Sequence, residues 1–174
     1  MFRLICAALF AVCVAFAGFY SDNAEAERTF LHGIGAESEK NYIQAIAYYT
    51  RAINIDPDLE IAFYSRGYTY AKLGDYSKAI ADYTQAIKVA PHYAVAFNSR
   101  GNAYRDLGDY KQAIADYTQA IKVAPHYIEA YNNRTRAYAK LSDYKSATQD
   151  ARKACELGDC KLLAQLGKKK LIRD

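Results

Sequence analysis

The stretch AIADYTQAIKVAPHY at residues 79–93 decides the fold, because it returns without a single difference at residues 113–127, 34 positions later. A catalytic pocket needs different side chains that converge on one point. An identical tandem copy is instead typical of a structural unit that is stacked on itself. We therefore interpret the chain as a repeat protein with a period of 34 residues.

Four rows of 34 residues cover most of the chain, at residues 26–59, 60–93, 94–127 and 128–161. We number the positions within each repeat from 1 to 34. Position 8 is small, and its residues are Gly33, Gly67, Gly101 and Thr135. Position 24 is large until the last repeat, and its residues are Tyr49, Tyr83, Tyr117 and Ala151. Positions 4, 8 and 11 share one helical face and positions 20, 24 and 27 share another, so each repeat is predicted to be a helical hairpin.

Turn residues separate the predicted helices at the expected places. The tetrapeptide LGDY at residues 73–76 and 107–110 ends the first helix with Gly and offers Asp75 or Asp109 as the N-cap of the second. Proline then separates one hairpin from the next, at Pro57, Pro91 and Pro125.

The segment FYSRGYTYAKLGDYSKAIADYTQAIKVAP, from Phe63 to Pro91, resembles the tetratricopeptide repeat family. Phe63 stands where the family prefers Trp, and the other matching residues are Gly67, Tyr70, Ala79, Tyr83, Ala86 and Pro91. The resemblance implies an all-α, right-handed superhelical solenoid at residues 27–161. A capping helix and basic tail are expected at residues 162–174. The resemblance also implies a protein-interaction module rather than an enzyme.

The N-terminal segment is predicted to be an export signal. Arg3 precedes 17 uncharged residues from Leu4 to Tyr20, and Ala24 and Ala26 form an Ala-x-Ala cleavage site, so residues 1–26 would be removed. The alternative is an uncleaved membrane anchor at residues 4–20, a length at the lower limit for a spanning helix. Both readings place the repeats beyond the cytoplasmic membrane, in the periplasm or secreted.

Two cysteines near the C-terminus, Cys155 and Cys160, are candidates for a disulfide in such an oxidising compartment. The alternative is that Cys155 is a small core residue, since it aligns with isoleucines of the preceding repeats. His92 and His126 are duplicates in equivalent loops, and no motif for catalysis, a metal or a cofactor is present, so we predict none of these. A formal charge of +4 without a basic stripe also disfavours nucleic acid as a partner.

Charged residues form a second recurrent pattern. Position 7 holds Arg66, Arg100 and Arg134, position 23 holds Asp82, Asp116 and Asp150, and the first repeat lacks both charges. We predict that each Arg lies against an Asp of the same or a neighbouring hairpin, because a guanidinium matches a carboxylate. The alternative is that duplication copied unrelated surface charges.

The candidate ligand surface is the face made by positions 2, 5, 9 and 12 of the first helices, where the repeats differ. It runs from apolar and aromatic to amide and basic, through Phe30, Ile34, Tyr64, Tyr68, Asn98, Asn102, Arg105, Asn132 and Arg136. We expect an extended peptide whose apolar residue meets the tyrosines and whose acidic or amide part meets the later residues. Related repeats that grip a C-terminal carboxylate need a Lys where Asn98 stands, so that clamp is not expected.

Alternatives to this groove remain at the level of sequence. The asparagines can be ordinary family residues, and the tyrosines partly exposed packing residues. For function, the alternatives are a structural subunit of an envelope complex and an enzyme accessory protein. A membrane would then be a partner only through an uncleaved N-terminal segment.

Overall fold

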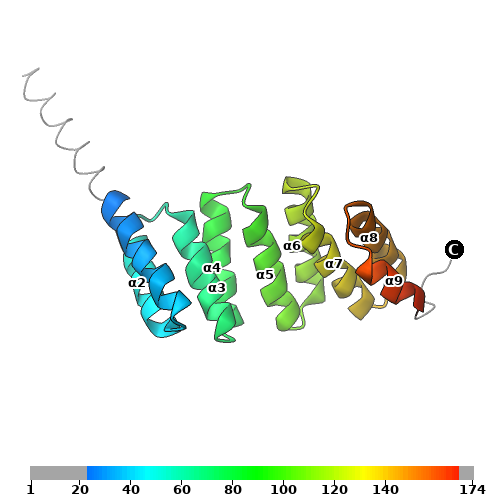
Figure 1. Ribbon diagram of the computed structural model, residues 1–174, viewed down its shortest axis with the longest axis horizontal. Helices are drawn as coiled ribbons and strands as arrows, with labels where there is room; N and C mark the ends of the chain where they lie inside the picture. The colour runs from blue at the N-terminus through cyan, green and yellow to red at the C-terminus, as the bar shows by residue number, and fades with distance from the viewer. Residues whose placement is uncertain (1–22, 169–174) are drawn as a thin grey trace, which may run out of the picture.

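The computed structural model of the protein describes residues 23–168, which form helices joined by short turns (Figure 1). A helix at residues 23–38 precedes α2 (Tyr42–Ile55), α3 (Glu60–Lys72), α4 (Tyr76–Val89), α5 (Ala94–Asp106), α6 (Tyr110–Val123), α7 (Ile128–Lys140), α8 (Tyr144–Glu156) and α9 (Lys161–Lys168). Successive helices pair into hairpins, and the hairpins stack in one row, which confirms the all-α solenoid. Most of the predicted signal or anchor, and the tail after residue 168, lie outside the described residues.

The turn inside each hairpin follows the predicted chemistry. Asp75 caps α4 by accepting a hydrogen bond from the backbone N–H of Lys78, and Asp109 and Asp143 cap α6 and α8 in the same way. The residue just before the capping residue takes a positive φ, which glycine adopts without strain in Gly74 and Gly108. Lys40 and Ser142 hold the same backbone conformation in the outer repeats.

A glycine and a tyrosine hold the two helices of each inner hairpin together. Tyr49, Tyr83 and Tyr117 are almost completely buried, as the pattern at position 24 predicts. A Cβ atom on Gly101 would lie only 2.7 Å from a ring carbon of Tyr117, so the ring needs a glycine opposite it. The last repeat exchanges the sizes, because Thr135 faces a helix that carries Ala151 in place of the tyrosine.

Each position-7 arginine joins three helices, which confirms its predicted pairing with aspartate. Arg66 donates from Nε and Nη2 to Asp82 of its own hairpin at 2.8 and 2.7 Å, and from Nη1 to Thr50 of the preceding hairpin at 2.9 Å. The equivalent sets are Arg100 with Asp116 and Thr84, and Arg134 with Asp150 and Thr118. Hydrogen bonding to Asp82 raises the pKa of Arg66, although burial opposes that rise. The link to the preceding hairpin was not predicted.

The short helix α9 closes the C-terminal end of the stack. Leu166 is buried against Ala147 and Ala151 of α8. In the turn before α9, the structure joins Cys155 and Cys160 by a disulfide. The disulfide stays a prediction for the cell, because it depends on the oxidising compartment that we propose below.

Replacing Gly101 by Leu should lower the free energy of unfolding by about 1–3 kcal/mol, because the new side chain must displace the buried ring of Tyr117. Denaturant titration followed by circular dichroism measures this change. Gly35→Leu is the matched control, since nothing lies within 4 Å of a Cβ atom there. Equal stability of the two variants would mean that the helices do not meet at position 8.

Replacing Arg100 by Met should cost about 3 kcal/mol, because it leaves the carboxylate of Asp116 buried without its partner. The side chain of Asp116 is only 7% exposed. The control is Lys153→Met, which removes an exposed pair with Glu156 and should cost less than about 1 kcal/mol. Similar losses in both variants, measured by the same denaturant titration, would contradict a structural role for the buried pair.

Candidate functional site

The first helices of the hairpins form one continuous layer. Besides contacting the helices next to them in the chain, α3 lies against α5 and α5 lies against α7 (Figure 1). Neighbouring second helices do not approach one another as closely among the described residues. The positions that differ between repeats are therefore brought together on one layer, which we call the first-helix face.

The aromatic end of the first-helix face is partly committed to packing. The Tyr64 ring lies 5.6 Å from that of Tyr83 and 5.2 Å from that of Tyr93, and its hydroxyl lies 3.4 Å from the hydroxyl of Ser99. Burial, and secondarily Tyr64, raises the pKa of Tyr93 to about 12. Tyr68 is 37% exposed. Of the two predicted tyrosines, only Tyr68 thus offers an open ring to a ligand.

Phe30 and Ile34 lie at the start of this layer and differ in the same way. The Phe30 ring is half-buried and packs 5.5 Å from the ring of Tyr49. Ile34 is 44% exposed. The first repeat therefore contributes an aliphatic rather than an aromatic surface to the face.

Two of the predicted asparagines are structural links. Asn98 is buried, and its Oδ1 accepts a hydrogen bond from Nδ2 of Asn133 at 3.0 Å, which ties α5 to α7. Asn132 is also buried and donates from Nδ2 to Asp159 at 2.9 Å, which ties α7 to the turn before α9. The backbone N–H of Lys161, and then Asn132, hold the pKa of Asp159 below its ordinary value. Neither Asn98 nor Asn132 is free to meet a ligand.

The remaining polar residues form an ordered row. Asn102 accepts hydrogen bonds from the Tyr117 hydroxyl at 2.8 Å and from Nη1 of Arg105 at 3.0 Å. Arg136 is exposed and donates from Nη1 to Asn133 at 3.0 Å. Each guanidinium is thus oriented by one asparagine, with its other N–H groups directed elsewhere. Arg105 also pairs with Asp106 at 2.9 Å.

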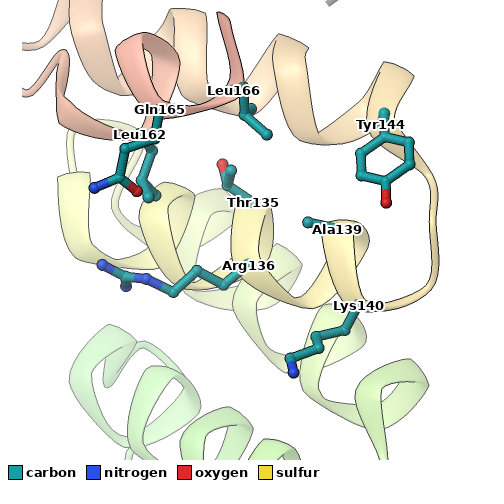
Figure 2. A pocket seen from close by; sticks show the side chains of 8 residues that line it. All are labelled: Thr135, Arg136, Ala139, Lys140, Tyr144, Leu162, Gln165 and Leu166. Atoms are coloured by element: carbon teal, nitrogen blue, oxygen red, sulfur yellow. The ribbon is translucent and has the colours of Figure 1, made fainter. Parts of the chain in front are cut away.

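A cavity of about 380 Å³ continues this row between α7, the start of α8 and α9. We call it the C-terminal pocket, and its lining is Thr135, Arg136, Ala139, Lys140, Tyr144, Leu162, Gln165 and Leu166 (Figure 2). Sequence reasoning selected only Arg136 from this set. The available signal was the missing tyrosine at position 24 of the last repeat.

The chemistry of these surfaces suits binding, since they offer a ring, amides, guanidinium groups and aliphatic carbons. Within residues 23–168, no three side chains of the metal-ligating types are grouped as an ion would require. The helices of the same region are also all too short or too polar to cross a bilayer. His92 and His126 are exposed in their loops.

Several solved structures share the fold of this chain. A magnetosome-type relative by title, "MamA 41-end from Desulfovibrio magneticus RS-1", is 22% identical with a TM-score of 0.71, covering 76% of this chain and 75% of that one. The first tetratricopeptide repeat domain of Spaghetti (RPAP3), bound to the HSP90 peptide SRMEEVD, is 24% identical with a TM-score of 0.67, covering 69% and 95%. The Arabidopsis OM64 domain is 25% identical with a TM-score of 0.64, covering 67% and 96%.

Sequence comparison supplies the family. No curated protein matches the chain. The model described as "Tetratricopeptide repeat" matches residues 61–93 and 94–127, and a second, "TPR repeat", matches residues 38–74. Together these matches span residues 38–127, more than half of the chain. With its stacked hairpins, its Gly–Tyr contacts and these matches, the chain belongs to the tetratricopeptide repeat family.

Proposed function

We propose that the protein is a non-enzymatic scaffold that holds an extended segment of a partner protein along the first-helix face, beyond the cytoplasmic membrane. One observation carries this proposal. The second and third repeats are identical over residues 79–93 and 113–127, which include nearly all of α4 and most of α6, yet they differ on the layer formed by α3 and α5. Variation is thus concentrated on one face, where it can serve recognition without disturbing the packing.

The order of side chains suggests what the segment carries. Tyr68 offers a ring face to an apolar or aromatic residue. Arg105 and Arg136 offer N–H groups to acidic or amide side chains further along. The peptide bound to the RPAP3 domain supports a peptide ligand for this fold. A C-terminal carboxylate clamp is not proposed, because Asn98 replaces the required lysine and is buried.

The partner is tested with the double variant Tyr68→Ala, Arg105→Ala. Tyr64 is left unchanged, because its ring packs between other tyrosines. We expect at least a tenfold loss of captured partner in a pull-down, since two contacts of about 1 kcal/mol or more are removed. Lys111→Ala, an exposed residue of α6, is the control. Equal capture by the folded double variant and the control would exclude this face.

Export is proposed from residues 1–26 and has its own test. We expect the protein outside the cytoplasmic membrane to begin at Glu27, measured by intact mass and N-terminal sequencing. Cleavage would remove Glu25, whose ion pair with Arg51 is exposed and worth less than about 1 kcal/mol. A full-length, outward-facing membrane protein would favour the anchor at residues 4–20. Full-length protein in the cytoplasm would contradict export.

A second candidate function is a structural subunit of an envelope complex. The first hairpin favours it, because Leu31 is 61% exposed and Ile43 is 81% exposed. A stoichiometric partner that survives the Tyr68→Ala, Arg105→Ala change but is lost with Leu31→Ser, Ile43→Ser would support assembly over peptide capture.

A further inference from the structure

The C-terminal pocket lies where the last repeat lacks a tyrosine. In the three preceding repeats the ring at position 24 fills the space between the two helices of the hairpin. Ala151 leaves that space open in the fourth repeat, and Thr135 replaces the glycine that would face the ring. Leu166 of α9 covers Ala151 but does not fill the whole volume, since about 380 Å³ remains.

The surroundings of Tyr117 show what this volume accommodates in a complete repeat. Residues at positions 8, 9 and 17 surround its ring, and they are Gly101, Asn102 and Tyr110. Residues at the same three positions line the C-terminal pocket, and they are Thr135, Arg136 and Tyr144. The pocket therefore occupies the place of an aromatic ring, and its wall is largely aliphatic and aromatic.

The end of the pocket that faces the groove is cationic. In the third repeat, Asn102 accepts the hydroxyl of Tyr117 at 2.8 Å, whereas the equivalent residue beside the pocket is Arg136. Figure 2 shows the side chains of Arg136 and Lys140 on the side of the pocket away from α9. Among residues 23–168, no carboxylate lies within 4.0 Å of either cationic group. The only hydrogen bond of the Arg136 guanidinium there is the one to Asn133.

We propose that the C-terminal pocket receives an aromatic side chain of the partner segment, and that Arg136 and Lys140 hold a carboxylate on the neighbouring residue. This proposal rests on the proposed function and names the chemistry of its ligand. The ring replaces the missing tyrosine, so it gains contact with Ala139, Tyr144 and Leu162. The carboxylate meets two cations that the described part of the chain leaves without an acidic partner.

The probe is a fluorescein-labelled heptapeptide, Gly-Ser-Phe-Asp-Glu-Ser-Gly, and its binding to the purified protein is followed by fluorescence anisotropy. Replacing Phe in the peptide by Ala should weaken binding about tenfold, because an aromatic ring then stays in water. Replacing its Asp and Glu by Asn and Gln should weaken binding by a similar factor at low salt. These peptide changes leave the protein untouched, so they test the pocket even if a protein variant fails to fold.

Protein variants locate the binding site. Ala139→Leu should weaken binding at least tenfold by filling the pocket, and Arg136→Gln with Lys140→Gln should remove the preference for the acidic over the neutral peptide. Lys122→Gln, an exposed cation on α6, is the control and should change neither. Circular dichroism establishes that each variant is folded.

Three results would overturn the proposal. The first is no saturable binding of the probe up to 1 mM, and the second is equal binding by Ala139→Leu and the wild type, where about 1 mM corresponds to only 4 kcal/mol. The third is a rise of tenfold or more in affinity when residues 169–174 are deleted, which would make the chain's own end the occupant. Loss of partner capture with Tyr68→Ala, Arg105→Ala alone would leave the proposed function standing while this pocket fails.

Discussion

The arginine at position 7 is the contact on which the stack depends. Each guanidinium of Arg66, Arg100 and Arg134 binds an aspartate of its own hairpin with two nitrogens and a threonine of the preceding hairpin with the third. The aspartates are only 7–9% exposed, so they require this partner. One residue thereby sets both the angle within a hairpin and the register between hairpins. The first-helix face follows from that register.

The same contact is missing where the stack ends. In the first repeat, His32 and Tyr48 replace the arginine and the aspartate, and their rings lie 5.5 Å apart. In the last repeat, Arg152 stands where the earlier repeats carry the accepting threonine, and α9 covers the hairpin instead. Neither end can therefore form the three-helix link with a further repeat of this type. The length of the solenoid is encoded by these departures from the consensus.

Packing also divides the chain into positions that must agree and positions that are free to differ. The Gly–Tyr contact leaves no room for a Cβ atom, so positions 8 and 24 agree in the first three repeats. The exposed ring of Tyr68 and the guanidinium of Arg136 have no such constraint. Where the constraint is relaxed, as at Ala151, a cavity appears rather than a collapse, because α9 is too short to fill the space that a ring occupies elsewhere.

The sequence by itself determined the period, the hairpins, the capping residues, the Gly–Tyr contacts and the Arg–Asp pairs. These features depend on local spacing within one repeat, and the repetition displays that spacing several times. Only the tertiary structure decided which groove residues are open. Asn98 and Asn132 are buried by partners 35 and 27 residues away, and Tyr64 packs on Tyr93 of the following turn. The C-terminal pocket likewise depends on where α9 lies, and no spacing within a repeat specifies the position of a helix outside it.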